Sequence, residues 1–419
     1  MPPSTRTLSN TFSAYGSVTK TFHWLTVLLI FSVIPLGLVA NNLAHHVRDP
    51  AITPSEAEIA RAAFLFSMHK TLGVTIFFVA LARISWALIQ PKPGLLNADN
   101  KPEAFAAETV HWLLYGSLLL VPLTGWIHHS ATTGFAPIWW PFGQSLPFVP
   151  KHEPLAETFA SLHMIFERVL VVALFLHIAG ALKHHVIDRD STLRRMLPGP
   201  SDAPTPQEQK HSLLPLGAAI VAWGVALGIG TGFGMFAPGH STATSQSATL
   251  EAVRSDWQVT EGSLGFKISQ MGSEVDGQFA DWTAAITFDE PDAPGPAGEV
   301  DVTIAITSLT LGSVTQQAMG ADFFDAAQFP TASFVAQIEK TESGYIATGP
   351  LTLKGQSVPV TLPFDLELDG DTARMTGQTW LQRLDYGIGA SLKDESSVGF
   401  AVDVSISLSA KRGASAGND

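Results

Sequence analysis

Hydrophobic patterning divides the chain into two halves with different periodicities. Before residue 240, five apolar stretches are long enough to cross a bilayer, which takes roughly 20 helical residues. They cover about residues 22–40, 64–89, 109–129, 162–183 and 213–236. After residue 249, short stretches alternate apolar and polar positions between Gly, Pro, Asp and Asn, as strands do. The pattern predicts a membrane all-α four-helix bundle plus a fifth transmembrane helix, followed by an all-β sandwich or a barrel of about eight strands.

Two polar segments mark the domain boundaries. Residues 198–212 are rich in proline and polar side chains, and residues 237–249 are small and polar, which is typical of a flexible tether. We therefore expect a four-helix domain over residues 1–198 and a β domain over residues 250–412. A linker, the fifth helix at about 213–236 and the tether fill residues 199–249, and a tail covers residues 413–419.

Composition and charge narrow the classes of function. Only 15% of residues are charged and 46% are hydrophobic, which fits a protein that is part membrane-embedded and part water-soluble. The net charge is −13, and the half after residue 239 carries 9 Lys and Arg against 24 Asp and Glu. This acidic half argues against a nucleic-acid partner, which needs a basic surface. The absence of cysteine excludes disulfides, thiolate metal sites and iron–sulfur clusters.

Charges in the loops predict the orientation. Ten Lys and Arg flank the spans on the side of the N-terminus and three flank them on the other side. Because positive loops stay in the cytoplasm, we expect a cytoplasmic N-terminus in a membrane protein with several spans. Five crossings then place the β domain outside.

Four histidines lie inside or at the ends of predicted spans, where an imidazole needs a partner. His163 and His177 are 14 residues apart on the fourth span, which puts them near one face, about 21 Å apart. His23 matches the depth of His177, and His69 matches the depth of His163. Two stacked bis-histidine sites in a helix bundle are what two b-type haems require.

Other residues of the spans are candidates for supporting these sites. Five glycines would let a flat macrocycle approach the backbone: Gly37, Gly73, Gly116, Gly125 and Gly180. His184 follows His177 by seven residues on the same stripe. It is either an interfacial residue or a residue that handles protons beside a quinone. His111 is either a neighbour of the ligands or an interfacial residue.

Residues from about 15 to 198 resemble the bacterial cytochrome b561 family. The stretches that carry the resemblance are FHWL (22–25), MHKTLG (68–73), LH (162–163) and LHIAGALKHHVIDRDSTLRRMLP (176–198). The resemblance implies that His23 and His177 ligate a cytoplasmic-side haem and that His69 and His163 ligate an outer one. The family includes cytochromes that react with quinones, and one branch resembles a superoxide oxidase that passes electrons to ubiquinone.

Residues from about 250 to 412 resemble the YceI-like, lipocalin-like family of isoprenoid-binding barrels. The stretches are DWQVTEGSLGFKISQMGSEVDGQFADWTAAITFD (256–289), ADFFDAAQFPTASFVAQIE (321–339), GPLTLKGQSVPVTLPF (349–364) and LQRLDYGIG (381–389). Two histidines that are usual in the family's first strands are replaced by Gly262 and Gln270. Five aromatic residues either line a lipid-binding lumen or fill a core: Phe266, Phe279, Trp282, Phe324 and Phe334.

Two functions from different classes fit these features. In the first, a quinone-linked oxidoreductase with two haems b transfers electrons between ubiquinone or another isoprenoid quinone and a periplasmic donor or acceptor, superoxide among the candidates. Its tethered barrel then holds the quinone or a similar isoprenoid lipid. In the second, the protein is an isoprenoid-lipid carrier whose membrane part is mainly an anchor or a redox sensor.

Overall fold

The computed structural model describes residues 7–48, 55–132, 136–142, 145–199, 212–237 and 250–413, apart from residues 252, 254, 271–272, 313 and 396. The predicted linker, tether and tail lie largely outside these residues. Contacts between Cα atoms divide the chain into two compact units. The first comprises Met1–Leu38, Ser67–Ala131 and Ile138–Gly239, and the second comprises Val39–Phe66, Thr132–Pro137 and His240–Asp419.

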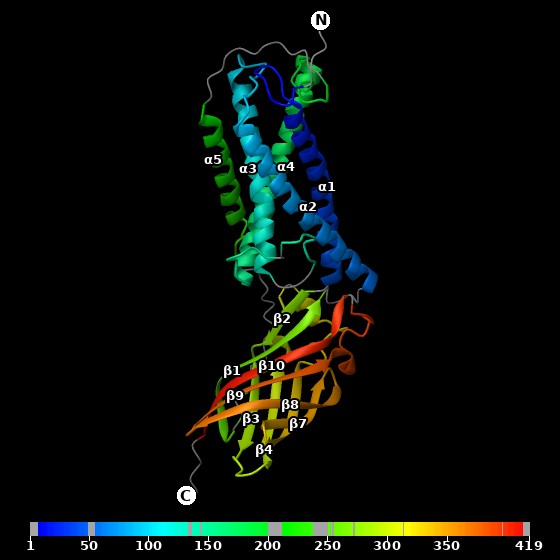
Figure 1. The fold of residues 1–419 in the computed structure, drawn as a ribbon, viewed down its shortest axis with the longest axis vertical. Coiled ribbons are helices and arrows are strands. Elements are labelled where there is room, and N and C mark those ends of the chain that lie inside the picture. Colours follow the sequence, from blue (N-terminus) through cyan, green and yellow to red (C-terminus); the bar gives the residue numbers. More distant parts are fainter. Residues whose placement is uncertain are drawn as a thin grey trace. The chain divides into compact units, whose positions relative to one another are not determined.

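Five long helices form the helical half (Figure 1). They are α1 (Ser17–Arg48), α2 (Glu56–Leu88), α3 (Lys101–Ala131), α4 (Glu153–Lys183) and α5 (Leu214–Gly232). All five are long and apolar enough to cross a membrane. They coincide with the five predicted spans, although α1 to α4 extend beyond the apolar stretches by several residues at their ends.

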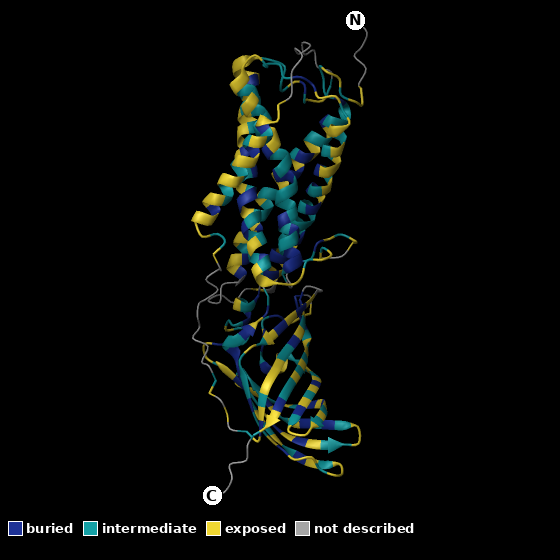
Figure 2. Ribbon diagram, turned by 90° about the vertical axis from the view of Figure 1, so that its left-hand side faces the viewer, coloured by how far each residue is buried: buried dark blue, intermediate teal, exposed yellow. Residues whose placement is uncertain are grey.

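Apolar side chains from the first three helices meet in a common core. Leu29 and Ile30 of α1 pack with Ile76 and Ala80 of α2 and with Leu118 of α3. Large apolar residues such as Phe175, which is 70% exposed, lie on the outer faces, and Figure 2 shows exposed residues running along the helices. A helix that is apolar on its outer face as well as its inner face is typical of a membrane span.

Side chains from the preceding loops cap the starts of two helices. Asn100 Oδ1 accepts from the backbone N–H of Glu103 at the start of α3, and Ser55 and Glu58 exchange the reciprocal bonds of a capping box at the start of α2. The end of α4 is different, because this helix passes directly into a π-helical turn, η1 (His184–Asp188). Arg189 then ends the turn in the left-handed conformation, with φ of 55°.

The second half is one antiparallel sheet of ten strands that curls on itself (Figure 1). The strands are β1 (Trp257–Gln270), β2 (Ser273–Phe279), β3 (Trp282–Phe288), β4 (Gly295–Ala305), β5 (Leu309–Thr310), β6 (Thr331–Thr341), β7 (Gly344–Leu353), β8 (Gln356–Asp369), β9 (Thr372–Gln382) and β10 (Val398–Arg412). Short connections are η2 (Ile306–Ser308), α6 (Thr315–Ala318) and η3 (Arg383–Tyr386). The prediction of an all-β barrel is confirmed, but the sheet has ten strands instead of about eight. One of the additional strands, β5, has two residues, too few to show a periodicity.

Strand order explains where the sheet meets itself. Neighbours run β3-β4-β6-β7-β8-β9-β10-β1-β2-β5, so β3 and β5 are the two edges. The start of β1 is tied to β3 where Asp256 N–H donates to Ile286 O and Trp257 Nε1–H donates to Phe288 O. Inward positions alternate with outward ones along the strands, as Figure 2 shows. The inward side chains enclose an apolar interior.

Candidate functional site

Four histidines of the bundle form two pairs. His23 of α1 faces His177 of α4, with ring centroids 6.2 Å apart, and His69 of α2 faces His163 of α4, with centroids 6.4 Å apart. These are the partners expected from their depths in the spans. All four rings are half-buried inside the bundle. That they ligate haem iron stays a prediction.

The ring separations fit an iron atom between each pair. A metal–nitrogen bond of about 2.0 Å places each centroid roughly 3.1 Å from the metal, so the two centroids lie about 6.3 Å apart when the arrangement is linear. A direct hydrogen bond between two imidazoles would bring the centroids to about 5 Å. Both observed distances therefore match bis-histidine ligation better than a hydrogen-bonded pair of histidines.

Backbone carbonyls orient the rings of the His69–His163 pair. His69 Nδ1 lies 3.1 Å from Val33 O, and His163 Nδ1 lies 2.8 Å from Val121 O. Since a carbonyl can only accept, each Nδ1 carries the proton and each Nε2 keeps its lone pair. This is the usual arrangement of histidines that bind a metal through Nε2.

Two glycines make room for the same rings. A Cβ added to Gly37 would lie 2.7 Å from His69 Cε1, and a Cβ added to Gly125 would lie 2.9 Å from His163 Nδ1. Each glycine follows the carbonyl that accepts from the ring by four residues, in VIPLG (33–37) and VPLTG (121–125). The expectation for Gly116 is corrected, because a Cβ there would meet Trp223 of α5 and not a site in the bundle.

Charged and aromatic side chains surround the His23–His177 pair. Arg83 Nη2 lies 3.4 Å from His23 Nδ1, and the His111 ring centroid lies 5.3 Å from that of His177. Arg83 and His111 therefore occupy the level of this pair. In the pattern of loop charges, Arg83 is only one of the charges that flank the spans. The pattern therefore does not predict that Arg83 lies beside His23. A signal was present, because His69 and Arg83 are 14 residues apart on α2, as His163 and His177 are on α4.

A buried guanidinium lies close to this level. Arg195 is 3% exposed, and its Nε and Nη2 have no hydrogen-bond partner among the described residues. Its guanidinium lies 5.5 Å from the ring centroid of Tyr15, which interacts electrostatically with Arg83 as well. A buried donor without a partner is costly. Haem b carries two propionates, so a haem bound here would need cationic donors of the kind that these arginines offer.

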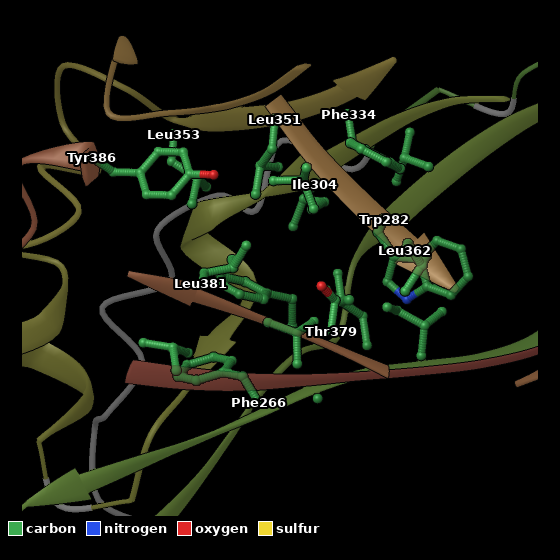
Figure 3. Close-up of a pocket in the computed structure, with 18 of the residues that line it drawn as sticks. Phe266, Trp282, Ile304, Phe334, Leu351, Leu353, Leu362, Thr379, Leu381 and Tyr386 are labelled. Atoms are coloured by element: carbon green, nitrogen blue, oxygen red, sulfur yellow. The ribbon is translucent and has the colours of Figure 1, made fainter. Parts of the chain in front are cut away.

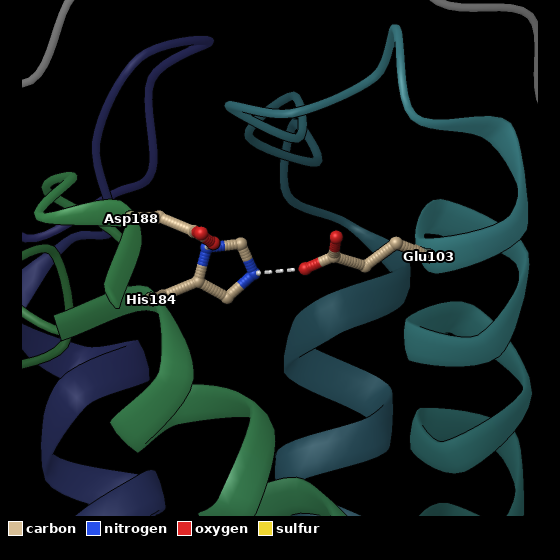
Figure 4. Close-up of side chains that lie close together, drawn as sticks. All are labelled: Glu103, His184 and Asp188. Atoms are coloured by element: carbon tan, nitrogen blue, oxygen red, sulfur yellow. Dashed lines mark ion pairs between the residues drawn. The ribbon is translucent and has the colours of Figure 1, made fainter. Parts of the chain in front are cut away.

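His184 lies in an ion-pair network beyond the end of α4. Its Nδ1 is 2.7 Å from Asp190 Oδ2, and its Nε2 is 3.3 Å from Glu103 Oε1 (Figure 4). Lys183 Nζ lies 2.6 Å from the same Glu103 oxygen and 2.8 Å from Asp188 Oδ2. The ammonium already forms an ion pair with each of these carboxylates, so we do not assign a metal ion to Glu103, His184 and Asp188.

Two features suit this network to holding protons. His184 is 8% exposed, so it is a buried residue and not a solvated one at the boundary. Burial raises the pKa of Asp190, but hydrogen bonds from Thr192 and His184 outweigh that effect and leave its pKa below the usual value. A buried imidazole between carboxylates can accept a proton at one nitrogen while the other stays hydrogen-bonded.

The barrel encloses an apolar cavity of about 290 Å³ (Figure 3). The structure places all five predicted aromatic residues on its lining: Phe266, Phe279, Trp282, Phe324 and Phe334. The same cavity reaches Trp257 at the start of β1 and Gln270 at its end, which are roughly 40 Å apart in an extended strand. An elongated apolar cavity suits a long hydrocarbon chain, and lipid binding by these residues stays a prediction.

Known proteins resemble the two halves separately. A family model for the prokaryotic cytochrome b561 matches residues 14–199, and one for the YceI-like domain matches residues 236–410. Cytochrome b561 homolog 2 of Escherichia coli (strain K12) is 28% identical over 193 residues, which cover 45% of this chain and 94% of that protein. The probable superoxide oxidase CybB of Yersinia pestis is 27% identical over 132 residues, 31% of this chain and 73% of that protein.

The β half has a closer relative. Protein YceI of Escherichia coli O17:K52:H18 (strain UMN026 / ExPEC) is 34% identical over 141 residues, which cover 32% of this chain and 73% of that protein. The two families named on the sequence are thus confirmed, in the predicted order. The chain is a multi-pass membrane protein that joins a domain matching the prokaryotic cytochrome b561 model to a YceI-like domain, and it belongs to the YceI-like family.

Proposed function

We propose that the helical domain binds two haems b and carries electrons between an isoprenoid quinone and a donor or acceptor on the opposite side of the membrane. The observation that carries the proposal is the pair of histidine ring separations, 6.2 and 6.4 Å. Haem b supplies a one-electron iron couple. Two histidines holding each iron would leave no ligand position open, which would favour electron transfer over direct binding of O₂.

The protein's own residues orient each haem and balance its charge. Val33 and Val121 carbonyls hold the rings of His69 and His163, while Gly37 and Gly125 leave space for them. Arg83 and Arg195 offer donors to carboxylates at the level of His23. The 14 residues between His163 and His177 span about 21 Å along α4, so the two sites divide the membrane between them.

Proton handling supports a quinone site near His184. Oxidation of a quinol releases two electrons and two protons, so a base must accept a proton where the electrons leave. His184 can accept one at Nε2 while Nδ1 remains bonded to Asp190, and Glu103 stabilises the cation that forms. The position of His184 seven residues after His177 keeps this base close to the haem level.

We further propose that the barrel shelters the polyprenyl chain of the quinone or of a similar lipid. Burying apolar surface contributes about 25 cal/mol per Å², and the cavity wall is almost entirely apolar. The proposed setting is a bacterial inner membrane with a cytoplasmic N-terminus and a periplasmic barrel. A reporter that is active only in the periplasm should work after residue 419 and be silent near residue 205; the reverse pattern would overturn this orientation.

One experiment tests the electron-transfer function directly. Purified protein in nanodiscs should contain two haems per chain, and both should be reduced on adding a short-chain ubiquinol under anaerobic conditions. His184→Gln should slow this reduction by about tenfold or more without loss of haem, while dithionite still reduces both haems fully. Matched His185→Gln, on the same turn but exposed, should leave the rate unchanged.

Other outcomes of this experiment select among the alternatives. A protein without haem would favour the isoprenoid carrier with a membrane anchor and would end the cytochrome proposal. Superoxide is the second candidate donor, favoured by the Yersinia relative. Haem reduction by superoxide, abolished by superoxide dismutase and followed by transfer to ubiquinone, would assign the direction of electron flow.

A further inference from the structure

The barrel cavity is polar at one end and apolar at the other. Near the end of β1, Gln270 and Tyr386 line the cavity and are 6% and 2% exposed. The opposite end is lined by Trp257, Phe288 and Ala410, which belong to an apolar cluster. A ligand with a polar head and an apolar chain would therefore bind in one direction only.

The polar end holds two buried oxygen atoms that have no partner among the described residues: Gln270 Oε1 and Tyr386 Oη. Figure 3 shows the Tyr386 hydroxyl directed into the cavity beside Leu353. Burial raises the pKa of Tyr386 to about 12, so the phenol keeps its proton and can donate. Buried polar atoms without partners are rare in folded proteins and call for an explanation.

Arg383 brings these two residues to the same end of the barrel. Its Nε donates to Gly399 O and its Nη2 donates to Val398 O, which fastens the start of β10 to η3. Val398 pairs with Gln270 across the β1–β10 ladder, and Tyr386 is the last residue of η3.

The same arginine has no donor left for a ligand. A guanidinium has five N–H donors, and Arg383 uses all of them on backbone carbonyls, at 2.7–3.1 Å from Gly389, Leu392, Ile388, Gly399 and Val398. Among the described residues that line the cavity, it is the only charged one. An anionic head group placed here could form no hydrogen bond to the guanidinium, so its lost hydration would be only partly compensated.

We propose that Gln270 and Tyr386 form the head-group subsite of the barrel, and that this subsite accepts a neutral hydroxyl or carbonyl head while rejecting prenyl phosphates. The proposal rests on the lipid binding proposed above and adds its direction and its selectivity. Tyr386 donates to a carbonyl or hydroxyl oxygen, and Gln270 accepts from a hydroxyl or donates through its amide. The chain then extends toward Trp257.

The test uses the full-length protein in nanodiscs and a diazirine-labelled C20 isoprenoid hydrocarbon without a head group, whose cross-links are mapped to barrel peptides by mass spectrometry. Three unlabelled competitors share one chain: geranylgeraniol, geranylgeranyl phosphate and the hydrocarbon without a head. Geranylgeraniol should compete about tenfold or more better than the phosphate. Tyr386→Phe and Gln270→Leu should each weaken competition by geranylgeraniol about 3- to 10-fold and leave the hydrocarbon unaffected.

A matched control is Tyr345→Phe, which removes a hydroxyl that lies 3.4 Å from Glu290 and does not line the cavity. It should change neither competitor. Equal competition by alcohol and phosphate, or unchanged competition in Tyr386→Phe, would overturn the subsite while leaving lipid binding intact. If no probe cross-links to the barrel at all, the proposed lipid binding itself fails.

Discussion

The two histidine pairs lie in the same helix bundle and share α4, yet different kinds of atoms hold them. At the His69–His163 pair the neighbouring helices α1 and α3 contribute Gly37 and Gly125, and backbone carbonyls hold the rings. Fourteen residues away along α2 and α4, the His23–His177 pair has Arg83 and His111 for neighbours. One pair is fixed by the main chain, and the other is surrounded by side chains that carry or can carry charge.

The difference shows that one bundle can place two pairs of histidines, which are chemically the same, in surroundings that differ in charge. A carbonyl and a glycine fix the position and tautomer of an imidazole but add no net charge. A guanidinium near the other pair favours the iron state of lower charge. We therefore expect geometry to dominate the first site and electrostatics to dominate the second, and substitutions of three kinds test the comparison.

The largest effect should come from removing a ligand. His163→Ala should abolish the haem of the His69–His163 pair and leave the other in place, and His177→Ala should do the reverse, so haem content falls by about half in each. The pyridine haemochrome assay and low-temperature spectra of the two haems would measure this. His45→Ala, at an exposed position of α1, is the control. Complete loss of both haems from either variant would mean that the pairs are not independent.

A smaller, selective effect should follow from filling the space beside one ring. In Gly125→Ala the new Cβ would lie 2.9 Å from His163 Nδ1, and overpacking of this kind typically costs about 1–3 kcal/mol. We expect weaker haem retention at the His69–His163 pair alone, measured by loss of one spectral component on warming. Gly224→Ala, where no atom lies within 4 Å of the added Cβ, should retain both haems. Equal retention in the two variants would show that the glycine does not restrict the ring.

The smallest effect should be electrostatic and confined to the other pair. Because Arg83 lies 3.4 Å from His23 Nδ1, its charge should favour the reduced haem. Arg83→Gln should lower the midpoint potential of the His23–His177 haem by about 50–100 mV, whereas Arg83→Lys should restore most of the difference. Spectroelectrochemical titration resolves the two components. A shift of equal size at both haems would contradict the proposed division between geometry and charge.

The sequence predicted the five helices, the β barrel and the partners within each histidine pair, because each of these leaves a side-chain pattern. A long apolar stretch predicts a membrane span, and the place of a histidine within that stretch predicts its depth in the membrane. The carbonyls of Val33 and Val121 were not predictable, since a hydrogen bond to the main chain leaves no mark on the residue that accepts it. The network of His184 was missed for another reason: the π-helical turn sets which carboxylates meet the ring.

The strand order of the barrel bears on how a long ligand could enter. Hydrogen-bonded strand pairs run without a break from β3 to β5, but no such pairing joins these two edge strands to each other. Near one end of the barrel, the seam where the sheet meets itself is held by hydrogen bonds from Asp256 and Trp257 to β3. A seam closed by a few hydrogen bonds instead of a full ladder opens at lower cost than a fully paired strand. A polyprenyl chain would then not have to be threaded end-on through a rigid ring, and the edges could part briefly while every other strand stays paired. The rate at which the ligand enters would then be set by the opening of the seam and not by the length of the polyprenyl chain.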